Sequence, residues 1–323
     1  TSGTDAAGGG HAHTGMMIYL GDNWPAEYRG NVFTLNLHGL RMNQESLHRQ
    51  GAGYVGKHAT DFMFTSDKWF RGIELSYAPD GSVYVLDWSD IGECHDNDGI
   101  HRTSGRIYRI SYGKTEVAKV NLTKWSNDDL AESVGSPNEW YSRQARQLIQ
   151  QRAAAGQDLT KAALKLMNTY RLTSSTPTAL RAMWTLNAIG SADEDWLLEQ
   201  SNDEREHIRT WALKLLCDQG ALSKKTQKRF IEMAGQDKAG LVQLQLASAL
   251  QQLPLEDRWP LANALVSQDT FAKDPMFPLL VWYGINPAVT ENRTAALKLV
   301  AQCKLPKVRQ FIARRLAGEA EKE

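Results

Sequence analysis

The densest group of polar side chains lies in Asp87–Gly99, where five carboxylates fall within 12 residues. Carboxylates this close repel one another unless a cation or basic side chains compensate them. Calcium prefers such oxygens, and Asp96-x-Asp98-Gly99 resembles the start of a calcium loop, although the glutamate that closes an EF-hand is missing. We therefore expect a calcium site with the ligands Asp87, Asp90, Asp96 and Asp98. The alternative is a solvated loop neutralised by Arg102, Arg106 and Arg109.

Two histidines near the start, His11 and His13, are separated by one residue. On a strand this spacing places both on one face, where a nearby carboxylate such as Asp22 would help them to ligate a metal. The alternative is that one caps a turn and the other lines a cleft. A third histidine, His38, precedes Gly39 directly after an apolar burst, a position that suits a general base as well as a hydrogen-bonded structural histidine.

Arg71 follows two aromatic residues in Asp67-Lys68-Trp69-Phe70-Arg71-Gly72. An arginine at a cleft floor can hold an anionic cofactor or substrate through paired hydrogen bonds. The alternative is an ion pair with Asp67 or Glu74.

Cys94-His95 lacks the second cysteine of a haem attachment motif, so no haem is expected. The sequence has no Walker loop, GxSxG or HExxH motif.

The elements that carry these residues are short strands. Up to about Gly113 the chain contains apolar bursts bounded by turn residues such as Pro79-Asp80-Gly81; they are residues 16–20, 31–37, 72–78, 82–88 and 106–112. Short strands at this spacing indicate a sandwich, a barrel or propeller blades. We assign residues 1–115 to a β domain and 116–136 to a linker.

Residues 137–323 have a helical pattern. Asn138-Glu139 begin a helix, and later apolar segments repeat a similar phrase at residues 179–190, 207–220, 241–254 and 307–318. Trp184 and Trp211 are 27 residues apart, and Trp211 and Leu246 are 35 apart. This irregular repeat predicts HEAT-like helical pairs stacked into a solenoid. An irregular helical bundle is the alternative.

Composition excludes several classes of protein. The 323 residues contain 37 basic and 37 acidic side chains, so the net charge indicates no nucleic-acid partner. No apolar run is long enough to predict a membrane span, and three cysteines are too few for a disulfide framework. Since the chain opens with Thr1 in a Gly-rich stretch, we expect it to be a piece of a longer protein.

The motifs GGGHAHTG, LGDNWP, YRGNVF, NLHGL and SYAPDGSVYVLDW, with GRIYRI after them, resemble the closing blades of a known family. This is the soluble glucose/sorbosone dehydrogenase type of β-propeller, found in exported planctomycete and verrucomicrobial proteins called membrane-bound dehydrogenases. The resemblance implies the last blades of a propeller followed by HEAT-like repeats. It covers residues 5–113 by motif and 125–323 by architecture alone.

Characterised relatives oxidise aldoses or sugar aldehydes with pyrroloquinoline quinone and calcium. By resemblance, Arg71 matches an arginine that holds the quinone carboxylates, whereas Trp69 stands where those enzymes often have a second one. Their catalytic base lies in earlier blades. The resemblance also implies export to the periplasm or cell exterior, and a c-type cytochrome domain or other protein as a partner that docks on the solenoid.

The leading hypothesis is therefore the C-terminal part of an exported propeller-type dehydrogenase that oxidises a sugar-like alcohol or aldose with a quinone. His38 as catalytic base and Arg71 as cofactor ligand would lie nearest the cleft. The alternative is a non-catalytic carbohydrate- or protein-binding scaffold, since propellers and solenoids both serve as interaction surfaces. Convergence of His11, His38, Arg71 and Asp87 on one cleft would favour the enzyme.

Overall fold

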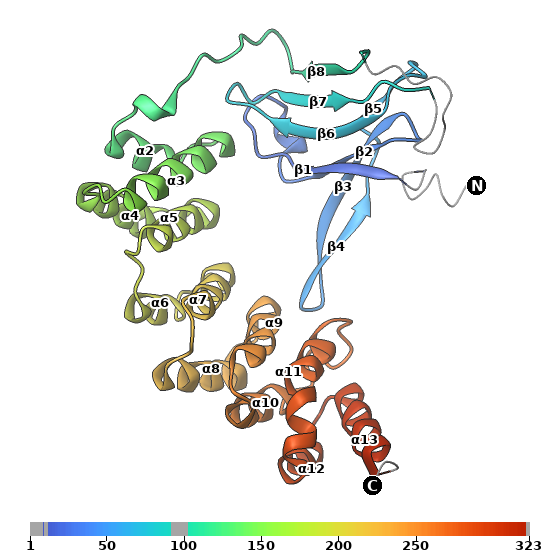
Figure 1. Ribbon diagram of the computed structural model, residues 1–323, viewed down its shortest axis with the longest axis vertical. Helices are drawn as coiled ribbons and strands as arrows, with labels where there is room; N and C mark the ends of the chain where they lie inside the picture. Colours follow the sequence, from blue (N-terminus) through green and yellow to red (C-terminus); the bar gives the residue numbers. More distant parts are fainter. Residues whose placement is uncertain (1–8, 10–11, 92–102, 321–323) are drawn as a thin grey trace. The chain divides into compact units, whose positions relative to one another are not determined.

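The computed structural model describes residue 9 and residues 12–91 and 103–320 (Figure 1). The chain divides into two compact units. The β unit comprises Thr1–His48 and Val55–Thr169, and the helical unit comprises Arg49–Tyr54 and Tyr170–Glu323. Within the described residues, eight strands come first and twelve α-helices follow. This order confirms the prediction of β structure before α structure.

The first sheet, sheet A, has five strands in the order β1-β2-β3-β4, with β5 also pairing with β3. The strands are β1 (His13–Ile18), β2 (Val32–Asn36), β3 (Arg41–Gln50), β4 (Gly53–His58) and β5 (Met63–Phe64), and the short helix η1 (Ala26–Tyr28) lies between β1 and β2. The pairs β1/β2, β2/β3 and β3/β5 are antiparallel.

The longest strand, β3, is absent from the apolar bursts of the sequence. Its residues RMNQESLHRQ are mostly polar, and the strand buries only Met42 and Asn43. Pairing with β2, β4 and β5 therefore holds it in the sheet, because backbone hydrogen bonds do not require apolar side chains.

The second sheet, sheet B, is antiparallel in the order β6-β7-β8, with β6 (Gly72–Tyr77), β7 (Val83–Asp87) and β8 (Arg106–Ile110). The predicted turn at Pro79-Asp80-Gly81 joins β6 to β7. Asp80 Oδ1 accepts a hydrogen bond from the Ser82 amide at 3.1 Å, and Gly81 has a φ of 73°, a conformation that favours glycine.

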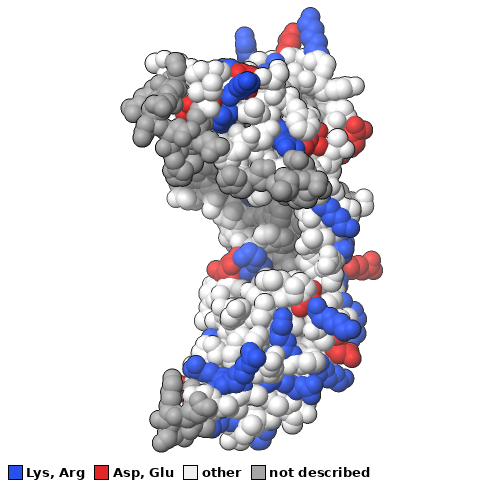
Figure 2. Space-filling model, turned by 90° about the vertical axis from the view of Figure 1, so that its right-hand side faces the viewer, with Lys and Arg blue, Asp and Glu red and all other residues white. Residues whose placement is uncertain are grey.

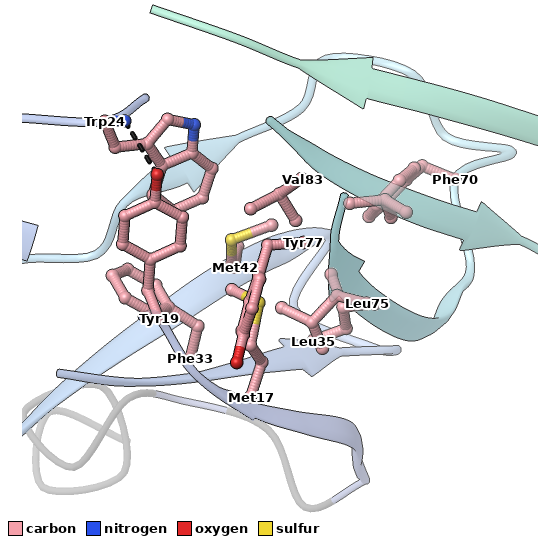
Figure 3. Close-up of a cluster of buried hydrophobic side chains, with 11 residues drawn as sticks. Met17, Tyr19, Trp24, Phe33, Leu35, Met42, Phe70, Leu75, Tyr77 and Val83 are labelled. Carbon is pink, nitrogen blue, oxygen red and sulfur yellow. Dashed lines mark hydrogen bonds between the residues drawn. The ribbon is translucent and has the colours of Figure 1, made fainter. Parts of the chain in front are cut away.

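Apolar side chains from both sheets form the core of the β unit, and Figure 3 shows them pointing toward one another. Tyr19 is fully buried. Its hydroxyl accepts from the amides of Trp24 and Asn23 at 2.7 and 3.0 Å and donates to the Gly81 carbonyl at 2.8 Å. Trp24 stacks between Tyr19 and Phe62, with ring centroids 4.6 and 4.4 Å away. The core thus occupies one face of sheet A and leaves the other for polar residues.

Capped helices follow β8. Leu122–Lys124 form η2, and α2 (Asn127–Ser133) begins with a capping box of Ser126 and Asp129. The next helix, α3 (Glu139–Ala154), begins after Asn138, whose side chain accepts from the Trp140 amide at 3.0 Å. This confirms the predicted helix start at Asn138-Glu139.

The remaining helices are α4 (Thr160–Leu172), α5 (Thr176–Ala188), α6 (Glu194–Gln200), α7 (Glu206–Asp218), α8 (Lys224–Gln236), α9 (Gly240–Ala249), α10 (Arg258–Val266), α11 (Phe277–Glu291), α12 (Arg293–Gln302) and α13 (Pro306–Ala320), with η3 (Leu250–Gln252) and η4 (Leu255–Asp257) between α9 and α10. From α5 onward most of them pack on the helix two further along the chain, whereas α6 packs on α7 and α10 also contacts α11. One series runs α5, α7, α9, α11, α13 and a second runs α8, α10, α12. The helical unit therefore contains two layers.

Among the described residues, no helix has both the length and the apolar character needed to cross a membrane.

The segment Arg49–Tyr54 is built into the helical unit. Ala52 is fully buried, and its amide donates to Asp274 Oδ2 at 2.8 Å. A Cβ on Gly240, at the start of α9, would lie 2.4 Å from the Ala52 Cα. Only glycine allows this close approach of two backbones.

Candidate functional site

One face of sheet A carries polar side chains. Met42 points into the core, so its neighbours Arg41 and Asn43 point to the opposite face. The register pairs them with Asn36 and Thr34 of β2. We call this side of the sheet the polar face of sheet A, although Asn36 and Asn43 are fully buried on it. Its members are His13, Thr34, Asn36, Arg41, Asn43, Glu45, His58 and Asp61.

Asp61 is the centre of this face, and its side chain is only 8% exposed. Arg41 Nη1 donates to Asp61 Oδ2 at 2.8 Å, and Asn43 Nδ2 donates to Oδ1 at 2.7 Å. Asn43 is itself fully buried. A buried carboxylate needs such partners, and these contacts fix the positions of both carboxylate oxygens.

His58 lies between two carboxylates. Its Nδ1 is 2.9 Å from Glu45 Oε1, and its Nε2 is 3.6 Å from Asp61 Oδ1. The second distance is too long for a direct hydrogen bond. An imidazole oriented by a carboxylate on one side is an arrangement suited to proton transfer.

An exposed aromatic ring borders this network. Phe64 of β5 is 66% exposed and pairs in register with Arg41. The Arg41 guanidinium carbon lies 5.1 Å from the centre of the Phe64 ring. The polar face therefore offers a flat apolar surface beside fixed donors and acceptors.

The three predicted histidines have different positions. His13 lies on β1, with Nδ1 3.2 Å from Thr34 Oγ1 and Nε2 3.3 Å from the Gly9 carbonyl. His38 is half-buried in the turn between β2 and β3. His11 lies outside the described residues. Both ring nitrogens of His13 thus have partners within the protein.

Asp87, expected as a calcium ligand, is buried at the end of β7. Its Oδ1 accepts from the amides of Arg71 and Ser89 at 2.8 and 2.9 Å. Its Oδ2 lies 2.7 and 2.6 Å from Nε and Nη2 of Arg106. Arg106 also contacts Asp67 at 2.6 Å. The pKa of Asp67 is lowered by a hydrogen bond from the Trp69 amide and by Arg106.

Arg71 is directed toward backbone carbonyls. Its Nη1 donates to Lys68 and Phe70 at 3.0 and 2.9 Å, and its Nη2 donates to Ile91 at 3.0 Å. Both terminal nitrogens are therefore engaged within the protein. This geometry does not fit the two-pronged contact that a quinone carboxylate would need.

The other three expected calcium ligands do not form a calcium site within the described residues. Asp90 is half-exposed, and its amide donates to the Trp69 carbonyl at 2.9 Å. Asp96 and Asp98 lie outside the described residues. Over residues 12–91 and 103–320, no three His, Cys, Asp or Glu side chains gather in a group that could hold a metal ion.

Sequence reasoning overlooked Glu45, His58 and Asp61. The spacing of His58 and Asp61, three residues apart, was the one local signal. Glu45 lies 13 residues before His58 and reaches it only because β3 and β4 pair. Since β3 has no apolar pattern, that pairing was invisible in the sequence.

The strands of the β unit lie within a family match. A family described as a domain of unknown function (DUF7133) matches residues 1–114. This range contains all eight described strands, and therefore both the polar face of sheet A and the Asp87–Arg106 pair. No curated protein matches the chain.

Proposed function

We propose that the β unit binds a sugar-like, polyhydroxylated ligand on the polar face of sheet A. The observation that carries this proposal is the network of Arg41, Asn43, Asp61 and His58 beside the exposed ring of Phe64. Sugars present neighbouring hydroxyls that both donate and accept hydrogen bonds, and an apolar ring face that packs on aromatic side chains. Fixed polar groups beside an apolar surface are typical of such sites.

We assign this binding function to a propeller-and-solenoid scaffold. Antiparallel sheets with polar outer positions are compatible with the last blades of a β-propeller. The two series of helices packed two apart are compatible with HEAT-like repeats, in which each unit contacts mainly its neighbours. By resemblance, the protein would act in the periplasm or outside the cell.

Oxidation of the bound sugar by a quinone is the second candidate function. The observation that favours it is His58, which Glu45 orients so that Nε2 is available to accept a hydroxyl proton. The engaged guanidinium of Arg71 and the pairing of Asp87 with Arg106 speak against the expected quinone and calcium ligands. Binding is therefore the function that the geometry supports best.

The test is calorimetric titration of the chain with a panel of mono- and disaccharides. We expect His58→Gln and Glu45→Gln to weaken binding by about tenfold, since one or two hydrogen bonds to the ligand are lost. The control is His48→Gln, because His48 is exposed and contacts Ser46. Absence of sugar binding, or equal binding by all variants, would overturn the proposal.

The same proteins distinguish the two candidates. Dye reduction is measured with each bound sugar, pyrroloquinoline quinone and calcium. Turnover that disappears in His58→Gln would identify a dehydrogenase, whereas binding without turnover would identify a non-catalytic module.

A further inference from the structure

Basic side chains predominate on the last two helices, α12 and α13, which also contain one acidic residue, Glu319. Residues 292–318 contain seven basic side chains and no acidic ones. All seven are exposed, and they lie on α12, on α13 and in the link between them. We call this set the basic terminal surface; it consists of Arg293, Lys298, Lys304, Lys307, Arg309, Arg314 and Arg315.

Some basic residues earlier in the helical unit have carboxylate partners. Arg209 contacts Asp237 at 2.7 Å, and Lys224 contacts Asp257 at 2.8 Å. In the described part of the chain, by contrast, no ion pair involves Lys298, Lys304, Lys307, Arg309 or Arg314. Figure 2 shows Lys and Arg side chains spread over the helical part of the visible face.

A cluster of like charges has a physical consequence. Neighbouring ammonium and guanidinium groups repel one another, and at physiological salt this repulsion extends over about 8 Å. An anionic partner relieves the repulsion and is attracted by the local field. The basic terminal surface therefore fits a negatively charged partner, although the whole chain is neutral.

The side chains around these charges narrow the class of partner. Val308 and Ile312 face the core and are fully buried. Phe311, the aromatic residue of these helices, packs against Trp282 with ring centroids 5.4 Å apart. In the described part of α12 and α13, no exposed aromatic ring is therefore available to stack on nucleic-acid bases or to enter a lipid interface.

The basic residues of α13 lie on several sides of the helix. At 100° per residue, Lys307 and Arg314 share one side of the helix, while Arg309 and Arg315 lie on two other sides. A flat membrane would meet only one side, whereas an extended polypeptide can follow the curvature of the helix. We propose that the basic terminal surface docks an Asp/Glu-rich segment of a protein partner.

The test uses fluorescence anisotropy with a labelled peptide of about ten glutamates, which presents the proposed carboxylate chemistry. The variant Lys298→Gln/Lys307→Gln/Arg314→Gln should weaken binding by about tenfold, and raising the salt from about 50 to 300 mM should weaken binding to the unmodified protein. The control is Lys214→Gln/Lys224→Gln/Lys225→Gln, which removes three lysines that already have carboxylate partners.

Two further probes separate the classes of partner: phosphatidylglycerol vesicles and single-stranded DNA. Tighter binding to either probe than to the peptide would overturn the proposal, as would no binding to the peptide or an equal loss in both triple variants. Thermal unfolding of each variant shows whether it is folded, and a triple variant that unfolds is replaced by Lys307→Gln/Arg314→Gln.

Discussion

Asp87 and Arg106 face each other across β7 and β8 and form a side-on ion pair, with Asp87 Oδ2 2.7 Å from Nε and 2.6 Å from Nη2 of Arg106. The Asp87 side chain is fully shielded from solvent. The pair links the two strands at the end of sheet B. In the sequence Asp87 was a candidate for calcium; in the structure its charge already has a partner.

Removing this charge should destabilise the β unit. Asp87→Asn removes one of the two carboxylate partners of Arg106, whose side chain is 34% exposed, so the loss should be about 2 kcal/mol. Urea unfolding, followed by tryptophan fluorescence, measures the loss. Glu116→Gln is the control, because Glu116 is exposed in the link after β8. Suppose instead that Asp87→Asn is as stable as the unmodified protein in EDTA, and that calcium stabilises the unmodified protein but not the variant. This result would contradict the account and identify Asp87 as a metal ligand.

Acid should weaken the turn between β6 and β7. Burial tends to raise the pKa of Asp80, but hydrogen bonds from Ser82 and the Arg109 guanidinium outweigh this effect and lower it. A carboxyl whose pKa is lower in the folded state stabilises the fold above its unfolded pKa of about 3.9 and loses that contribution as the pH falls through its folded pKa.

Asp80→Asn should therefore reduce the thermal unfolding temperature at pH 7, and its difference from the unmodified protein should shrink between about pH 4 and pH 2. Calorimetric scans across this range make the measurement. Because other carboxyls also have lowered pKa values, the difference between the two proteins isolates Asp80. A difference that stays constant down to pH 2 would contradict the prediction.

Two glycine substitutions in the helical unit should change the stability of the protein in opposite directions. Gly240→Ala brings a Cβ within 2.4 Å of the Ala52 backbone and should destabilise the protein by about 2 kcal/mol. A Cβ on Gly235, in α8, would meet no other atom within 4 Å, so Gly235→Ala should stabilise the protein by up to about 1 kcal/mol. Denaturant unfolding measures the free energy of unfolding of both variants, and a change in the same direction for both would refute the prediction.

Phe64 should contribute to ligand binding and little to stability. Its side chain is 66% exposed, so Phe64→Ala should change the free energy of unfolding by less than about 1 kcal/mol. The same change should weaken sugar binding by about fivefold or more, because an aromatic contact is lost. Tyr112→Ala is the control, since Tyr112 is 65% exposed and lies after β8. Equal effects of both variants on binding would argue against a role for Phe64.

The buried thiol of Cys217 should be unreactive in the folded protein. Burial raises its pKa to about 11, so the reactive thiolate is scarce at pH 8. Peptide mapping after treatment with iodoacetamide should find Cys217 unmodified in buffer and modified in concentrated guanidinium. Rapid modification of Cys217 without denaturant would show that α7 opens locally.

Local patterns predicted five of the eight described strands and the start of α3. The apolar bursts at residues 72–78 and 82–88 became β6 and β7, and the cap at Asn138 became the start of α3. These features depend on neighbouring residues: alternation buries one face of a strand, and a side-chain oxygen satisfies the first free amides of a helix. They could therefore be predicted without knowledge of the rest of the chain.

The grouping of side chains on the polar face of sheet A could be seen only in the tertiary structure. Glu45 and His58 belong to strands without an apolar pattern, and Asp61 follows in a loop, so no local rule joins them. The same holds for Asp87: its sequence neighbours are acidic, but its partner Arg106 lies 19 residues away on the next strand. Short-range periodicity determined the strands and helices that have an apolar pattern. Strand pairing placed β3 and β4 in the sheet and decided which charges meet, because a buried charge takes its partner from whatever the folded chain brings beside it.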